Sequence, residues 1–227
     1  AHLVFPILLD QRWTGIAFTL SGCTAVLIGL RVGNMGAYLF GSLVQVVGAA
    51  LFATTDFSAE QAQPWLNLHL AGFLLIAVAG LISALAMHRH GNGAKTADRA
   101  GDERDFARLF AAAGLCWAVG WWWAAFEFEI AAHAGVYGLG ARIGLAALTA
   151  LGLLAIGGRW RCASARVIAL ALLPALCLFA ARALQELEHP AQALGWLAWP
   201  AAFATLFLVL RKNEDGPAES VLPGSHG

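Results

Sequence analysis

The run WLNLHLAGFLLIAVAGLISALAM, residues 65–87, decides the fold class of this chain. It contains no Asp, Glu, Lys or Arg, and the mixed-charge segment HRHGNGAKTADRAGDERD, residues 88–105, follows it directly. A membrane-spanning helix needs about 20 consecutive, largely apolar residues, within a range of about 17–25. The run therefore predicts a helix that crosses a lipid bilayer and ends in a polar joint.

Six further apolar runs repeat this pattern, at residues 13–30, 36–54, 109–126, 143–158, 167–183 and 193–210. Hydrophobic residues make up 59% of the chain and charged residues 12%, against about 45–50% and about 25% in soluble domains. So few charges argue against a soluble helical bundle. The run at 143–158 is short for a span unless its helix begins nearer Gly138. We predict an all-α, polytopic transmembrane helical bundle of about seven spans.

The cationic residues indicate which way the chain crosses the membrane. When the joints are assigned alternately to two sides, eleven of the 14 Lys and Arg residues fall on one side. They are Arg31, Arg89, Lys95, Arg99, Arg104, Arg108, Arg159, Arg161, Arg166, Arg211 and Lys212. Only Arg12, Arg142 and Arg182 fall on the other side. Lys and Arg are enriched in cytoplasmic loops, so we predict the N-terminus outside and the C-terminus inside.

The chain divides by composition into two membrane halves with a polar joint between them. Residues 1–87 would hold three spans, preceded at 1–9 by what reads as the tail of an earlier apolar segment. Residues 88–105 have no apolar face and predict a cytoplasmic linker, and residues 106–212 would hold four spans. Residues 213–227 are rich in Gly and Pro and predict a disordered cytoplasmic tail.

One group of polar residues on the predicted outer face could carry chemistry. Its members follow the fourth span or flank the sixth: Glu127, Glu129, His133, Arg142, Arg182, Glu186, Glu188 and His189. If the helices continue, Glu129 and His133 share a face at i and i+4, and so do Arg182 and Glu186. Two carboxylates with two histidines could bind a divalent cation, or act as acid and base on an envelope substrate. The alternative is that these are charged helix ends paired with Arg142 and Arg182.

Three polar residues lie inside apolar runs. Gln45 is expected to bond to a neighbouring helix, while Asn67 and His69 lie near the outer boundary and are expected to form interfacial hydrogen bonds. Glycines recur at intervals that allow close contact between helices in lipid. The pairs are Gly22 with Gly29, Gly41 with Gly48, and Gly140 with Gly144.

Common catalytic and metal-binding signatures do not occur in the sequence. There is no HExxH, no GxSxG and no glycine-rich phosphate loop after a strand. Cys23, Cys116, Cys162 and Cys177 have no metal-ligand spacing, and we expect them to be small packing residues. The sequence predicts no metal and no particular cofactor, and it leaves enzymatic activity open.

Several short motifs resemble the large bacterial membrane proteins grouped as domain of unknown function 2339. They are Arg12–Trp13, Ser21–Gly22, Gly29–Leu30–Arg31, Leu39–Phe40–Gly41, Trp121–Trp122 followed by Glu129 and His133, and His189–Pro190 followed by Gly195–Trp196–Leu197–Ala198–Trp199–Pro200. The resemblance covers about residues 12–211, which are similar to the C-terminal portion of those proteins. Ser21 departs from the pattern, in which Glu precedes the glycine. The resemblance implies a bacterial inner-membrane protein and no established activity.

We therefore expect a multi-pass protein of the bacterial inner, cytoplasmic membrane. The leading hypothesis is a non-enzymatic envelope or transport-associated component with an outer-face binding patch. The alternatives are an intramembrane enzyme acting on a lipid-linked or envelope glycan substrate, and a solute permease. The expected partners are the lipid bilayer and other membrane or envelope proteins, and nothing in the sequence indicates a nucleic-acid partner.

Overall fold

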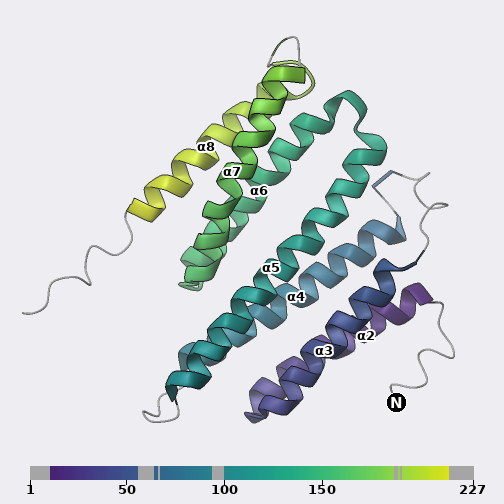
Figure 1. Ribbon diagram of the computed structural model, residues 1–227, viewed down its shortest axis with the longest axis vertical. Coiled ribbons are helices and arrows are strands. Elements are labelled where there is room, and N and C mark those ends of the chain that lie inside the picture. The colour runs from purple at the N-terminus through teal and green to yellow at the C-terminus, as the bar shows by residue number, and fades with distance from the viewer. Residues whose placement is uncertain are drawn as a thin grey trace, which may run out of the picture. The chain divides into compact units, whose positions relative to one another are not determined.

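The computed structural model describes residues 11–55, 64–65, 67–93, 100–186, 189 and 191–214 (Figure 1). The described residues form helices and turns, with no strand among them. The α-helices are α2 (Gln11–Val32), α3 (Met35–Ala53), α4 (Leu68–Gly93), α5 (Ala100–His133), α6 (Gly138–Arg159), α7 (Ala163–Glu186) and α8 (Gly195–Glu214), and a 3-10 turn, η1 (Gly135–Tyr137), precedes α6. The prediction of an all-helical chain is confirmed over this part of the sequence.

Each predicted apolar run corresponds to one α-helix. The short run at 143–158 belongs to a helix that begins at Gly138, which gives α6 a length of 22 residues. Within the described ranges, six helices, α2 to α7, are long and apolar enough to cross a membrane. The seventh, α8, has 20 residues and carries Arg211 and Lys212 in its last turn, so its apolar part is shorter. Six such helices are typical of a multi-pass membrane protein.

The chain forms two compact units, which we describe separately. Unit 1 is Ala1–Gly135 and unit 2 is Val136–Gly227. The sequence suggested a division at residues 88–105 instead. Helix α4 continues to Gly93 and α5 begins at Ala100, so helix occupies both ends of that segment. Residues 1–10, 94–99 and 215–227 lie outside the described part, as do the predictions that fall on them.

In unit 1, a tight turn joins α2 to α3. Gly33 has a φ of 72°, in the left-handed region that ends many helices. Asn34 then caps α3, because its Oδ1 accepts a hydrogen bond from the backbone N–H of Ala37 at 3.1 Å. The two helices therefore run antiparallel, side by side (Figure 1).

Glycines bring the backbones of α2 and α3 into contact. A Cβ atom added to Gly22 would lie 2.5 Å from the carbonyl oxygen of Gly41, and one added to Gly48 would lie 2.6 Å from the backbone nitrogen of Thr19. A Cβ atom added to Gly15, seven residues before Gly22, would lie 2.8 Å from the carbonyl oxygen of Gly48 and 2.8 Å from the backbone nitrogen of Phe52. Close approach of this kind lets helices associate in lipid, where burial of apolar surface contributes little. The predicted role of Gly22, Gly41 and Gly48 in helix contacts is confirmed.

The interior of unit 1 has three layers along the helices. At one end lies an apolar cluster of Ile16, Ala49, Phe52, Leu70, Phe73, Ile76 and Ala125. At the other end lies a second cluster of Val26, Leu30, Met87 and Ala111. Between them, Gln45 Nε2 donates to Ser83 Oγ at 2.8 Å, and Ser83 Oγ donates to Cys23 Sγ at 3.5 Å. The predicted bond from Gln45 to a neighbouring helix is confirmed, since Ser83 belongs to α4.

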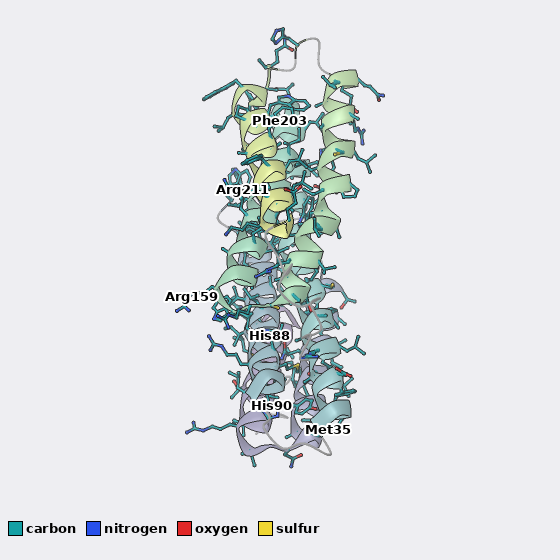
Figure 2. All side chains as sticks on the ribbon, turned by 90° about the vertical axis from the view of Figure 1, so that its left-hand side faces the viewer. Met35, His88, His90, Arg159, Phe203 and Arg211 are labelled. Carbon is teal, nitrogen blue, oxygen red and sulfur yellow. The ribbon has the colours of Figure 1, made fainter. Side chains whose placement is uncertain are left out.

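The second cluster marks the basic end of unit 1. Arg31 follows Leu30, Arg89 lies just beyond Met87, and Arg108 lies just before Ala111. Figure 2 shows Met35, at the start of α3, and His90, near the end of α4, at this same end of the unit. The arginines of three helices thus gather at one end, and Glu129 lies toward the other.

In unit 2, α6 packs against both α7 and α8. The α6–α7 turn holds Arg161 with a φ of 50°, and Ala193 and Leu194, just before α8, also have positive φ values. A Cβ atom on Gly140 would lie 2.6 Å from the carbonyl oxygen of Ala193, so this glycine lets the segment before α8 lie close to α6. A Cβ atom added to Gly144 would meet nothing within 4 Å among the described residues, so its predicted close contact with another helix is wrong. In both figures α8 ends before the level of the α6–α7 turn.

Candidate functional site

The predicted outer-face group divides between the two units. In unit 1, α5 carries Glu127, Glu129 and His133. In unit 2, α6 carries Arg142, α7 carries Arg182 and Glu186, and His189 lies between α7 and α8. Glu188 lies outside the described residues. The residues of each unit are therefore described separately.

Glu129 is the centre of the unit 1 part of the site. It is only 3% exposed, which is rare for a carboxylate without partners. Its Oε1 accepts a hydrogen bond from Asn67 Nδ2 at 2.6 Å, and its Oε2 accepts one from the backbone N–H of Trp65 at 3.0 Å. Both carboxylate oxygens are therefore engaged by groups from the segment that leads into α4.

Asn67 uses both ends of its amide. While its Nδ2 donates to Glu129, its Oδ1 accepts from the backbone N–H of Leu70 at 2.7 Å and so caps the first turn of α4. The hydrogen bonding predicted for Asn67 is confirmed, and its position at a membrane interface stays a prediction. One side chain thereby fixes the start of α4 and ties it to the last turns of α5.

Trp65 is held in an uncommon backbone conformation beside this carboxylate. Its φ is 65°, in the left-handed region, where a residue other than glycine carries strain on the order of 1–3 kcal/mol. The hydrogen bond from its backbone N–H to Glu129 offsets part of that strain. The carboxylate therefore stabilises the turn that places Asn67.

Two histidines belong to this region: His133 beside the carboxylate, and His69 against the ring of Phe128, the residue before Glu129. His133, one turn beyond Glu129, places Nε2 at 3.8 Å from Oε2 of that acid and keeps 19% of its side chain exposed. His69 is 4% exposed, and its ring lies 4.5 Å from that of Phe73 and 4.9 Å from that of Phe128, between ring centroids. We call Trp65, Asn67, His69, Glu129 and His133 the Glu129 cluster. The predicted i, i+4 relation of Glu129 and His133 is confirmed.

The unit 2 part of the site is more exposed. Arg182 Nε lies 2.5 Å from Glu186 Oε1, and the two side chains are 68% and 50% exposed. The predicted pair is present, but exposed pairs of this spacing contribute only about 0.3–0.5 kcal/mol. His189 Nδ1 accepts a hydrogen bond from the backbone N–H of Ala191 at 3.1 Å, which orders the segment before α8. Arg142 is partly buried near the start of α6.

The Glu129 cluster is a polar site whose carboxylate has little remaining capacity to accept hydrogen bonds from another molecule. Its carboxylate already accepts two hydrogen bonds and faces an imidazole, so the members most accessible to another molecule are Trp65, which is 47% exposed, and His133. Over the described ranges, no group of three or more His, Cys, Asp or Glu residues is arranged to hold a metal ion. The geometry favours a structural anchor whose edge can contact a partner.

Sequence reasoning identified Glu129 and Asn67 but not that they bond to each other. They are 62 residues apart, and the apolar pattern of α4 and α5 gives the faces of the helices without their register. The backbone N–H of Trp65 could not be found from residue type at all. Ser83, the partner of Gln45, was also missed, although a lone serine inside an apolar run was an available signal.

Comparison of the chain with protein-family models, with curated proteins and with solved structures finds no match. The resemblance to domain of unknown function 2339 stays a prediction. We therefore infer the function of this chain from its own residues and their geometry.

Proposed function

We propose that this chain is a non-enzymatic, multi-pass component of the bacterial inner membrane, and that the face carrying the Glu129 cluster binds an envelope or transport partner. The observation that carries this proposal is the engagement of both Glu129 oxygens by Trp65 and Asn67. A carboxylate held in this way fixes Trp65 and Asn67, just before α4, against α5. It is poorly placed to exchange protons with a substrate.

The proposed topology has seven spans, with the N-terminus outside and the C-terminus inside. It is supported by the gathering of Arg31, Arg89 and Arg108 at one end of unit 1, opposite Glu129. In unit 2, Arg159 and Arg161 lie at the α6–α7 turn, whereas Arg182 lies near the other end of α7. Helix α8 is the seventh proposed span, with Arg211 and Lys212 at its cytoplasmic end. This arrangement follows the enrichment of cations on the cytoplasmic side.

The two alternatives gain less support from the geometry. An acid–base enzyme would need Glu129 free to transfer a proton, yet its oxygens act as acceptors for structural donors. A permease would need a polar path at mid-membrane depth, and the polar layer of unit 1 is the bonded set of Gln45, Ser83 and Cys23. The resemblance to domain of unknown function 2339 supports the bacterial inner-membrane assignment.

In-cell photo-crosslinking tests the binding face. A photoreactive amino acid replaces Phe128 or Ala131, both exposed beside the Glu129 cluster, and in a control it replaces Leu109, which is 67% exposed near the other end of α5. We expect a crosslinked species of defined mass from Phe128 and Ala131 and none from Leu109. Equal crosslinking at all three positions, or none at the two test positions, would contradict the proposed binding face.

The variant Glu129→Gln separates an anchor from a catalyst. It keeps an oxygen acceptor at this position but removes the carboxylate that proton transfer requires. We expect crosslinking at Phe128 and growth of a strain that depends on this chain to persist with Glu129→Gln. Loss of function in a variant that still folds and still crosslinks would favour the enzyme.

A further inference from the structure

A cavity of about 190 Å³, open on one side, lies between α3, α4 and α5 of unit 1. It is separate from the Glu129 cluster and lies beside the polar layer of the unit. Its lining includes Gln45, Ser83, Phe110, Ala113, Gly114 and Trp117. The glycine and alanine leave space between the helices, while the two aromatic rings supply flat apolar walls.

Gln45 contributes to the lining of this cavity an amide oxygen, Oε1, that accepts no hydrogen bond from the described residues around it. The residue is only 5% exposed, and its Nε2 donates to Ser83 Oγ. Within the described part of the chain, no group donates a hydrogen bond to Gln45 Oε1. An amide oxygen that no protein group donates to can accept a hydrogen bond from another molecule. Because Gln45 lines the cavity, this oxygen is available to a molecule bound there.

The size and the lining of the cavity together indicate the shape of that molecule. An engineered cavity of about 150 Å³ with an apolar lining binds benzene, so about 190 Å³ is enough for one substituted ring. Aromatic rings favour offset or edge contacts with Phe and Trp side chains. A ring that enters from lipid and carries one hydroxyl would pack against the aromatic side chains and donate a hydrogen bond to the amide oxygen of Gln45.

We propose that this cavity binds the phenolic ring of a membrane-soluble molecule, of the kind that quinols carry, and that its hydroxyl donates a hydrogen bond to Gln45 Oε1. Phe110 and Trp117 contact the ring, and the Gln45–Ser83 hydrogen bond holds the acceptor in place. This inference concerns a different part of unit 1 from the proposed partner-binding face. It does not depend on which end of the unit faces the cytoplasm.

A matched pair of probes tests the hydroxyl directly. The full-length chain in detergent is titrated with 4-methylphenol and with toluene, at concentrations expressed as mole fractions in the detergent phase, and binding is followed by calorimetry and by the shift in Tm. A neutral hydrogen bond is worth roughly a 2- to 12-fold change in affinity. We therefore expect 4-methylphenol to bind roughly 2- to 12-fold tighter than toluene. Equal affinities in the unmodified protein would overturn the proposal.

Three variants locate the site. Gln45→Leu removes the acceptor, so the two probes are expected to bind equally, while Gln185→Leu, an exposed glutamine of α7, keeps the full preference. Ala113→Phe fills the cavity and is expected to abolish binding of both probes. Binding of 4-methylphenol that survives Ala113→Phe would place the ring elsewhere and overturn the proposal. If Gln45→Leu does not fold, the unmodified protein and Ala113→Phe still decide the question.

Discussion

The two units differ in the contacts that hold their helices together. In unit 1, Gly22 lies against the backbone of Gly41, and hydrogen bonds join α3 to α4 at Gln45 and the start of α4 to α5 at Glu129. In unit 2, Gly140 lets the segment before α8 lie close to α6, and Thr205 donates its hydrogen bond to Ala201 of its own helix.

This difference indicates where a preorganised site can exist. Helix association in a membrane depends on close packing and on polar contacts between helices, because lipid tails are as apolar as the helix surfaces. Unit 1 has both kinds of contact, and its buried Gln45 and Glu129 side chains bond to groups on other elements. We therefore expect changes in unit 1 to disturb folding and binding more than equivalent changes in unit 2.

The largest expected effect comes from the glycine contact between α2 and α3. In Gly22→Leu the new side chain would meet the backbone of Gly41 and Gln45, so the helices must separate. Overpacking of this kind destabilises by about 3 kcal/mol. The matched variant is Gly144→Leu in α6, where an added Cβ atom meets nothing within 4 Å among the described residues. Unfolding of purified protein in mixed micelles measures both, and an equal loss of stability would remove the distinction between the units.

The next effect concerns the buried carboxylate. Glu129→Ala leaves the N–H of Trp65 and the amide of Asn67 without their acceptor. An unsatisfied buried donor costs about 1–3 kcal/mol, so we expect a loss of about 2 kcal/mol in the free energy of unfolding. Hydrogen exchange at the start of α4 is also expected to increase, since Asn67 caps that helix. Unchanged exchange there would show that Glu129 does not anchor the α3–α4 segment.

A smaller effect is expected from the polar layer of unit 1. Ser83→Ala removes the acceptor for Gln45, and hydrogen bonds between membrane helices average about 0.6 kcal/mol. Thr24→Val serves as control, because the Thr24 hydroxyl donates to Leu20 within α2 itself. We expect a measurable loss for Ser83→Ala and little for Thr24→Val in the same unfolding assay. The opposite order would mean that the bond between α3 and α4 contributes nothing.

The smallest effect is expected at the exposed pair of unit 2. Glu186→Gln breaks the contact with Arg182, but both side chains are at least half exposed. Such a pair contributes about 0.3–0.5 kcal/mol and is screened by salt. We expect the Tm to change by less than it does for Glu129→Ala and to approach that of the parent protein at high ionic strength. A loss as large as that of Glu129→Ala would contradict the assignment of the anchoring role to unit 1.

The helices could be predicted from the sequence because uninterrupted apolar runs are a strong signal for a span. The run at 65–87 has no charged residue, and α4 covers most of it. The residues at which the helices end were harder to predict from the sequence. Charged residues at 88–93 and 100–105 read as a linker, yet backbone hydrogen bonding continues through polar residues, so α4 and α5 both extend into them.

The candidate site was predicted only at the level of single helices. Spacing of four residues gave the Glu129–His133 and Arg182–Glu186 pairs correctly. The partners of Glu129 come from a separate segment, and one of them is a backbone N–H, which any residue type supplies. Gly144 shows the same limit, because glycine spacing alone does not say which helix face meets a neighbour.

The central claim is that these helices cross a membrane with the 88–105 segment on the cytoplasmic side. Cysteine labelling in intact cells tests it, in a chain whose Cys23, Cys116, Cys162 and Cys177 are replaced by alanine and a single cysteine replaces Gln61 or Lys95. With a maleimide that crosses only the outer membrane, we predict labelling of Gln61→Cys in intact cells and of Lys95→Cys only after the inner membrane is broken. Labelling of Lys95→Cys in intact cells would contradict the proposed topology.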